Sequence, residues 1–436
     1  MSKPSLLKRL DTWVPLSRLT YRIPAHGRSL FCSLGGIVFF GFLLMIATGI
    51  ILLQFYNPLP DQAYKSLETI QKIGFLSYIR ALHYWISQGV LIALIVHLSR
   101  VFVIGAYKTP RQVTWWLGVA LFATMLMGSY FSGTVLKWDE EGADALAHYQ
   151  QSLRYLGPLG AMMTDSLPGS SSINVRIFAS HITVFPILII ILLIGHFLLI
   201  RTFNLSPTPW DKWSKQPQIP KEEMKGRFDQ HARTIVVFSL IYYGFLAVVA
   251  FISRAPLGPA PSASHDPLKP PWPFLWMYGF ENVWGVVAVL FASGALFGFL
   301  ALIPLIDRKQ DRSFAARRKI LTLGGIVAFL VLTLTLHGWI TPAQEHTHGH
   351  GEAAHEDDGH AHDEEEEHSH DEEEADHAHD EEEEHSHDEE EADHSHDEEE
   401  EHSHDEEEAD HSHDEEEEHS HDEEKEDSSD AEWDGF

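Results

Sequence analysis

Cysteine is almost absent from this chain of 436 residues, which contains one. A single cysteine excludes a disulfide framework and any zinc or iron–sulfur site built from several cysteines. Basic and apolar residues are scarce in residues 344–436, which carry 48 Asp or Glu and one Lys, a net charge of −47. The other 343 residues carry 30 basic and 16 acidic side chains, a net of +14, so the overall −33 describes the carboxyl-terminal region alone.

Long apolar runs dominate the first 343 residues. Crossing a bilayer takes about 20 helical residues. The first run follows a basic segment and lacks a short apolar stretch with a small-residue cleavage site, so we expect a retained span and not a signal peptide. The sequence therefore predicts an all-α integral membrane protein, without a surface basic enough to bind nucleic acid. The seven predicted spans are 30–54, 77–105, 113–135, 174–202, 233–253, 280–305 and 318–341.

Basic residues alternate from loop to loop. Lys and Arg are frequent before the first span and between spans four and five and six and seven, and two of the seven residues between spans two and three are basic (Lys108 and Arg111). Each of the longer intervening loops carries only two. Because basic loops stay on the cytoplasmic side, we expect a cytoplasmic amino terminus in a cell (inner) membrane. Seven crossings then place the acidic tail on the periplasmic or exterior side.

The tail repeats HSHDEEEADHSHDEEEE with a period of 17 residues. It has almost no apolar side chains to bury, so burial cannot offset the entropy of ordering and we expect disorder. Two interpretations stay open. The tail is a solvated polyanion, or it is a low-affinity buffer for divalent metal ions such as zinc, nickel or copper, with ligands at His368, His370, His385 and His387.

Four histidines lie inside two of the predicted spans, where ionisable residues are costly. His83 and His97 are fourteen residues apart, and His181 and His196 fifteen, so at about 100° per residue each pair lies near one helix face, separated by about 21 Å. Both spans run inward, so His83 faces His181 near the outer surface and His97 faces His196 near the inner surface. A single histidine of this kind is usually a hydrogen-bonded core residue, but two matched pairs suit two six-coordinate haems.

Arginines and glycines accompany these histidines. Arg80, Arg100, Arg176 and Arg201 lie near the span ends, where haem propionates would need cations; snorkelling to lipid headgroups is the alternative explanation. Small residues would leave room for flat rings, although close helix packing explains any one glycine equally well. The glycines in question are Gly35, Gly36, Gly49, Gly118, Gly128 and Gly133.

The segments SLGGIVFFGFLLMIATG, YIRALHYWISQG with HLSRVF, GTVLKWD, and RIFASHITVFP with HFLLIR resemble the cytochrome b/b6 family. The resemblance covers residues 18–205 through these motifs and 233–341 through topology. The interval of fifteen residues between His181 and His196 is similar to the interval in the b6 branch of the family. The resemblance as a whole implies a basic segment at 1–29, a four-helix di-haem domain at 30–205 and a cytoplasmic linker at 206–232. A three-helix domain at 233–343 would complete the quinol site, ahead of the tail at 344–436.

The family's activity would then be quinol oxidation coupled to proton translocation. The resemblance implies electron transfer from membrane quinol through two stacked haems b, with His83 and His181 holding the outer haem and His97 and His196 the inner one. It also implies a Rieske iron–sulfur protein and a cytochrome c-type subunit or acceptor as partners, in a dimeric complex.

Two departures from the family concern the outer quinol site. The family's Pro-Glu-Trp-Tyr motif aligns with Pro-Pro-Trp-Pro at residues 270–273, so its glutamate is missing. A quinol must lose protons to a nearby base, and Glu281, Asp266, His265 and Trp272 are the candidate site residues. A helix-start carboxylate facing the helix dipole is the alternative explanation of Glu281. In addition, Gly-Tyr-x-Leu-Pro-Trp is replaced by GTVLKW, and the third span holds one extra residue.

A third departure concerns haem attachment. The b6 branch binds an extra c-type haem through a cysteine just before Leu-Gly-Gly. Counting from His26 places Cys32 at that position, whereas counting back from Leu34 places Ser33 there. Both a covalent haem at Cys32 and an ordinary buried thiol stay open.

Two other functional classes are consistent with parts of the sequence. The missing glutamate favours a di-haem membrane anchor that links quinone to a dehydrogenase without bifurcating electrons. The histidine-rich tail favours a metal transporter or storage protein, but transporters place ionisable groups along a midplane path, and these histidines form two separate layers.

Deletion of residues 344–436 tests whether the protein is a metal transporter or storage protein. We expect the truncated protein to keep its haem content and its rate of quinol oxidation, because the four histidines lie outside the tail. Absorbance spectra and quinol-oxidation assays of membranes measure both. Loss of haem on truncation would contradict an accessory role for the tail.

Overall fold

The structure is a computed structural model, which describes residues 21–164, 171–262 and 268–343. Within these residues, seven helical segments are long and apolar enough to cross a membrane. This confirms the predicted all-α membrane architecture, while the tail and its histidines lie outside the described residues. The seven segments are Leu30–Leu53, Gly74–Ile104, Gln112–Val135, Ile173–Phe203, Phe228–Ile252, Val287–Ile306 and Arg318–Ile340.

The sixth span begins later than the sequence predicts. The interval 280–305 was expected to be one helix, but the chain forms a short helix α12 (Leu275–Trp284) and then α13 (Val287–Ile306). Gly285 separates them with a φ of 78°, a left-handed conformation that glycine adopts without steric cost. Glu281 therefore lies in the last turn of α12, not at the start of a span.

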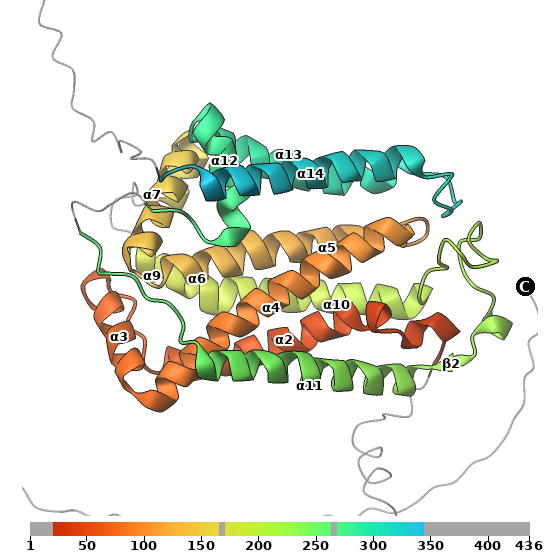
Figure 1. Ribbon diagram of the computed structural model, residues 1–436, viewed down its shortest axis with the longest axis horizontal. Helices are drawn as coiled ribbons and strands as arrows, with labels where there is room; N and C mark the ends of the chain where they lie inside the picture. Colours follow the sequence, from red (N-terminus) through yellow and green to blue (C-terminus); the bar gives the residue numbers. More distant parts are fainter. Residues whose placement is uncertain (1–20, 165–170, 263–267, 344–436) are drawn as a thin grey trace, which may run out of the picture. The chain divides into compact units, whose positions relative to one another are not determined.

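The long helices run side by side (Figure 1). Helix α2 (Leu30–Leu53) packs along α4 (Gly74–Ile104), and α11 (Phe228–Ile252) packs against both. The third span consists of α5 (Gln112–Ala123), the π-helical η3 (Thr124–Tyr130) and α6 (Phe131–Val135). It packs against the fourth span, which consists of α9 (Ile173–Ala179), the π-helical η4 (Ser180–Val184) and α10 (Phe185–Phe203). Helix α12 packs closely on α14 (Arg318–Ile340).

A continuous apolar core fills the middle of the spans. It joins side chains from six of the seven spans and from α12, including Phe42, Leu91, Leu126 and Leu193. On α4 the core residues Ile86 to Leu94 all lie between His83 and His97. The two histidine levels are therefore separated by a closely packed, apolar layer.

Short helices and one loop make up the end of the molecule that carries His83. Helices α3 (Pro60–Lys72), α7 (Glu140–Arg154) and α8 (Pro158–Met163) lie there (α3 and α7 at the left of Figure 1). Residues 254–262 are tied to them, because Tyr64 donates to the carbonyl oxygen of Gly258, and the Asp139 carboxylate accepts from the Gly258 amide at 2.9 Å. Asp139 also caps the start of α7 through the Gly142 amide.

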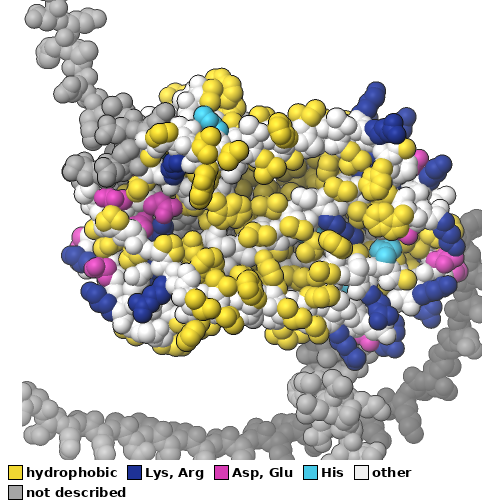
Figure 2. Space-filling view, in the orientation of Figure 1, with side chains coloured by type: hydrophobic (Ala, Val, Ile, Leu, Met, Phe, Trp, Pro, Cys, Tyr) yellow, Lys and Arg dark blue, Asp and Glu magenta, His cyan; other side chains and the backbone are white. Residues whose placement is uncertain are grey.

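The opposite end gathers the basic segments. Arg111 donates to carbonyl oxygens of residues 203–205 and 217, and Arg312 donates to the Gln216 carbonyl oxygen at 2.6 Å. A two-residue strand pair, β1 (Arg22–Ile23) with β2 (Gly226–Arg227), joins the amino-terminal segment to the same end. In Figure 2, Lys and Arg side chains gather at this right-hand end, and hydrophobic side chains cover the middle of the visible face. All four segments that the sequence places on one side thus meet at one end.

One partly buried acid, Asp307, connects two of these basic loops. Asp307 accepts from Lys108 at 2.5 Å, from the Tyr107 hydroxyl at 2.6 Å and from Arg317 at 3.0 Å. Burial alone would raise the pKa of Asp307, but these three hydrogen bonds outweigh burial and lower the pKa below its usual range. Lys108 and Arg317 are almost fully buried, so their charges depend on this carboxylate.

Asp307→Asn should therefore destabilise the folded protein. Two buried cations would lose their shared counter-charge, a cost of about 3–5 kcal/mol, and we expect Tm to fall by several degrees in detergent. Asp311→Asn is the matched control, because Asp311 lies four residues away, is only partly buried and accepts its described hydrogen bond from the Ser313 amide. Equal melting temperatures for the two variants would contradict the role given to Asp307.

Candidate functional site

Two spans bring histidines face to face at one level. His83 on α4 and His181 on η4 have ring centroids 6.5 Å apart, with an angle of 59° between their planes. Two imidazoles that bind one metal ion from opposite sides, each through a bond of about 2 Å, lie about 6 Å apart between centroids. The spacing of this pair therefore fits one iron between the rings.

Hydrogen bonds at Nδ1 orient three of the four rings. Thr48 Oγ lies 2.8 Å from His83 Nδ1, and Ser132 Oγ lies 2.8 Å from His181 Nδ1. His196 Nδ1 lies 3.1 Å from the Thr114 carbonyl oxygen. Occupying Nδ1 leaves Nε2 as the nitrogen directed toward a metal, and a partner of this kind fixes both tautomer and ring orientation.

A π turn explains how fifteen residues keep His181 and His196 on one face. Fifteen α-helical residues overshoot four turns by about 60°. In the structure, residues 180–184 form a π turn, which accommodates one extra residue within the helix. A second π segment, residues 124–130, lies in the third span, where the sequence holds its extra residue.

Four of the six glycines lie directly against the four rings. A Cβ added to Gly35 would lie 3.1 Å from the His97 ring, and one added to Gly133 would lie 3.3 Å from the His181 ring. Gly49 and Gly118 face His83 and His196 in the same way, at 3.4 and 3.7 Å. Gly36 and Gly128 instead face Ile235 and Phe185, so those two serve helix packing. Each ring thus has a glycine beside it from a neighbouring span.

The inner pair lies one apolar layer away from the outer pair. His97 lies further along α4 than His83, and His196 lies on α10, beyond the π turn that carries His181. His97 Nδ1 is buried without a hydrogen-bond partner among the described residues.

The four arginines lie in different environments. Arg80 donates to the carbonyl oxygens of Ala255 and Pro256 at 2.9 and 2.6 Å, and Arg176 donates to those of Thr164 and Met162. Arg100 donates to the sulfur of Cys32 at 3.0 Å, and Arg201 is exposed. The outer two therefore position loops, and the free thiol of Cys32 has a cationic neighbour.

Residues 88–261 match the family model described as cytochrome b (N-terminal)/b6/petB. The cytochrome b6 of Desmonostoc sp. is 32% identical over 189 residues, which are 42% of this chain and 87% of that protein. The chain belongs to the cytochrome b/b6 family. A cytochrome bc complex cytochrome b subunit of Chlorobaculum thiosulfatiphilum is 28% identical over 339 residues, 71% of this chain and 74% of that one. A chain of a hyperthermophilic respiratory Complex III has the same fold, with a TM-score of 0.62 at 19% identity, covering 77% of this chain and 92% of that chain.

Membership of the cytochrome b/b6 family implies b-type haem, and the residues present fit it. The facing imidazoles of His83 and His181, their hydrogen bonds at Nδ1 and the glycines beside the rings are what a flat macrocycle held by two histidines would require. Among the described residues, no cluster of three or more His, Cys, Asp or Glu side chains could hold another kind of metal ion.

The quinol-site candidates are only partly brought together. Asp266 and His265 lie outside the described residues. Trp272, in η6 (Trp272–Phe274), donates from Nε1 to the Gln88 side-chain oxygen at 2.8 Å, and Tyr130 donates to the same oxygen at 3.0 Å. Glu281 lies further along α12 and is 5% exposed. A carboxylate in the last turn of a helix meets the unfavourable end of the dipole, so the helix-start explanation of Glu281 is wrong.

Sequence reasoning missed His148, on α7. Its Nε2 lies 3.5 Å from the Glu281 carboxylate, and its Nδ1 lies 3.5 Å from that of Asp144. Burial alone would lower the pKa of His148, but Asp144 and Glu281 together raise it to about 9. Burial raises the pKa of Glu281, and the positive charge of His148 opposes that shift only in part. The segment GADALAHYQQSLRYL gave no signal for His148 because its partner is 133 residues away in sequence.

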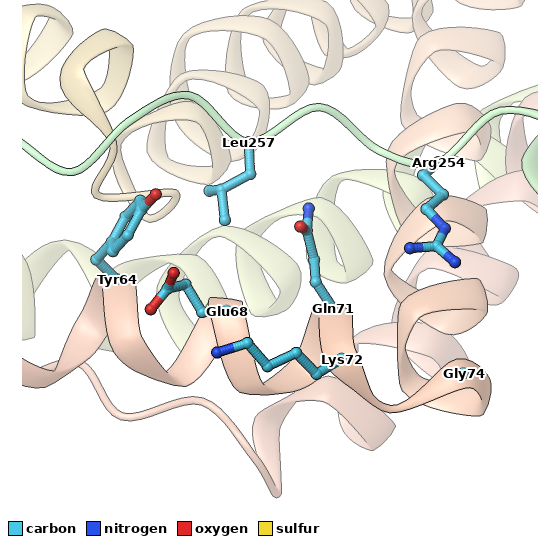
Figure 3. A pocket seen from close by; sticks show the side chains of 7 residues that line it. All are labelled: Tyr64, Glu68, Gln71, Lys72, Gly74, Arg254 and Leu257. Carbon is cyan, nitrogen blue, oxygen red and sulfur yellow. The ribbon is translucent and has the colours of Figure 1, made fainter.

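A separate pocket of about 320 Å³ lies at the same end of the molecule. Figure 3 shows Tyr64, Glu68 and Gln71 rising from α3 toward the loop that carries Arg254 and Leu257. Lys72 and Gly74 complete its lining, and none of the four histidines contributes. The pocket combines charges of both signs and is distinct from the histidine pairs.

Gly133→Val should disturb one ring selectively. The valine side chain would push against His181, which lies 3.3 Å from the first added carbon, so we expect about half the haem content. Gly244→Val is the matched control, because a Cβ there meets nothing within 4 Å. The measurement is the haem-to-protein ratio of the two purified variants. Full haem content in Gly133→Val would contradict the close contact between residue 133 and the His181 ring.

Proposed function

We propose that this protein is the cytochrome b subunit of a bc-type quinol oxidoreductase, a respiratory or photosynthetic electron-transport complex that also translocates protons. The observation that carries the proposal is the facing pair His83 and His181, with His97 and His196 further along the same two spans and a glycine of a neighbouring span beside each ring. The cytochrome b of a bc complex and the Complex III chain named above support the assignment to such a complex.

In this proposal His83 and His181 hold the outer haem b, and His97 and His196 hold the inner one. When bound, the two haems supply one-electron carriers across the bilayer. Thr48 and Ser132 keep the outer imidazoles in one tautomer, with Nε2 toward the iron. The apolar core between the levels excludes water from the path. Arg100 and Arg201 lie near the inner ends of their spans and would supply cations for propionates there.

The outer quinol site would lie between the third span, α7 and η6–α12. Phe131 contacts both Phe274 and Tyr149 through their rings, at centroid distances of 6.0 and 5.4 Å. Gln88 holds Trp272 in place by the hydrogen bond described above. Glu281 supplies the carboxylate that the Pro-Pro-Trp-Pro segment lacks, and its oxygen accepts a quinol proton.

The charge distribution supports an orientation, and the family supports the partners. The end that gathers the basic loops would face the cytoplasm, so that the quinol site and the acidic tail would lie outside. We propose a Rieske iron–sulfur protein and a cytochrome c-type subunit or acceptor as partners in a dimeric complex. A covalent c-type haem at Cys32, and divalent metal binding by the tail, stay predictions from the sequence.

The di-haem anchor without bifurcation is the second candidate, because proline occupies the position of the family's glutamate. Isolation of the complex separates the two functions. A co-purifying Rieske protein, with quinol oxidation blocked by outer-site inhibitors, favours the bc-type complex, whereas a co-purifying dehydrogenase favours the anchor.

Replacing single histidines tests the two haem assignments. We expect His83→Gln and His97→Gln each to remove one b-type component from the reduced-minus-oxidised spectrum, because each variant loses one axial ligand. Quinol-driven reduction of the remaining haem should also be lost or slowed. His337→Gln, on α14, is the control, since its described partner is Thr341. Two intact b-type signals in His83→Gln would contradict the assignment.

A further inference from the structure

Three ionisable side chains form a line from the buried end of α12 to the surface of α7. The side chain of Glu281 is 4% exposed, that of His148 20% and that of Asp144 18%. The Glu281 carboxylate and the Asp144 carboxylate lie on opposite sides of the imidazole, each 3.5 Å from a different ring nitrogen. The Asp144 carbonyl oxygen lies 2.9 Å from Nδ1, which holds the ring in this position.

This line begins beside the aromatic side chains assigned to the quinol site. Phe274 and Glu281 are seven residues apart, about two helical turns, so they lie on one side of η6–α12. The ring of Phe274 contacts Phe131, and Phe131 contacts Tyr149, the residue next to His148. The imidazole thus lies on α7, which carries Tyr149, and the buried carboxylate lies on α12, which follows Phe274 directly.

The helices that pack against α7 and α12 carry almost no other charged side chains near His148. Helices α7 and α12 pack against α6, α8, α13, α14 and η6. Of these, α6, α8, α13 and η6 carry no ionisable side chain, and α14 contributes His337 at this end, within hydrogen-bond distance of Thr341. Among the described residues, Asp144 and Glu281 are the groups that raise the pKa of His148.

We propose that His148 relays protons from Glu281 to Asp144 and so forms the proton exit of the outer quinol site. The proposal rests on the function proposed above. Asp144 is a positioning and exit group that acts through His148.

The relay balances with the oxidation of quinol. The quinol O–H bond breaks and its proton binds the Glu281 carboxylate, while the quinol's two electrons pass to the iron–sulfur partner and to the outer haem. His148 takes part in its neutral form, with its proton on Nδ1 against the Asp144 carbonyl oxygen. Glu281 gives its proton to Nε2, and the Nδ1–H bond breaks as that proton passes to Asp144 and on to water. The imidazole then carries its proton on Nε2 and returns to the Nδ1–H form by proton exchange with water, after which a second proton follows the same path and quinone is left.

Quinol oxidation by the purified complex, with a short-chain quinol and a c-type cytochrome as acceptor, tests the relay. We expect His148→Gln to lower kcat about 10²-fold at pH 7, the lower range for a positioned acid–base group, with both haem signals unchanged. Added imidazole should restore part of the rate in His148→Gln but not in Glu281→Gln, where His148 is still present. Glu68→Gln, in the pocket of Figure 3, is the control carboxylate.

The pH profile separates a relay from a structural role. The wild-type rate should rise with pH as His148 releases its proton more readily, and this rise should disappear in His148→Gln. Asp144→Asn should shift the rise to lower pH, because the carboxylate that raises the pKa of His148 is lost. An unchanged rate and profile in His148→Gln, or an unshifted profile in a folded Asp144→Asn complex, would overturn the relay. A wild-type complex that holds two haems but oxidises no quinol would instead overturn the proposed function.

Discussion

The rest of the structure depends on the burial of imidazole side chains inside membrane spans. Polar rings in this environment are costly, and neighbouring spans supply hydrogen-bond partners for three of the four. Thr48 and Ser132 bond the outer rings, and a glycine lies beside each of the four. Helix spacing, π turns and small residues are all consistent with the single requirement that two flat groups be held between these helices.

The two ends of the molecule differ because they meet different demands. At one end, buried arginines and Asp307 hold basic loops together through hydrogen bonds to carbonyl oxygens. At the other, Asp139 and Arg80 hold the loop at 254–262 over α4 and α7. Further along the chain, η6 and α12 carry Trp272 and Glu281. The apolar core between the ends keeps the two histidine levels apart.

The spans and the histidine levels could be predicted because they depend on local properties. Run length determines where a helix can cross, and helical periodicity determines which histidines share a face. The break at Gly285 was missed because an apolar run does not reveal a left-handed residue within it. His148 was missed because its role depends on contact with Glu281, and only tertiary packing brings them together. The packing of α11 on α2 and α4 was beyond sequence reasoning for the same reason.

An optical redox titration of the purified wild-type complex, with EPR of the oxidised state, tests the central claim most directly. Two pairs of axial imidazoles predict two one-electron b-type components of equal amplitude, both low-spin with two nitrogen ligands. A single b-type component, or a high-spin signal from a five-coordinate iron, would contradict the pairing of His83 with His181 and of His97 with His196.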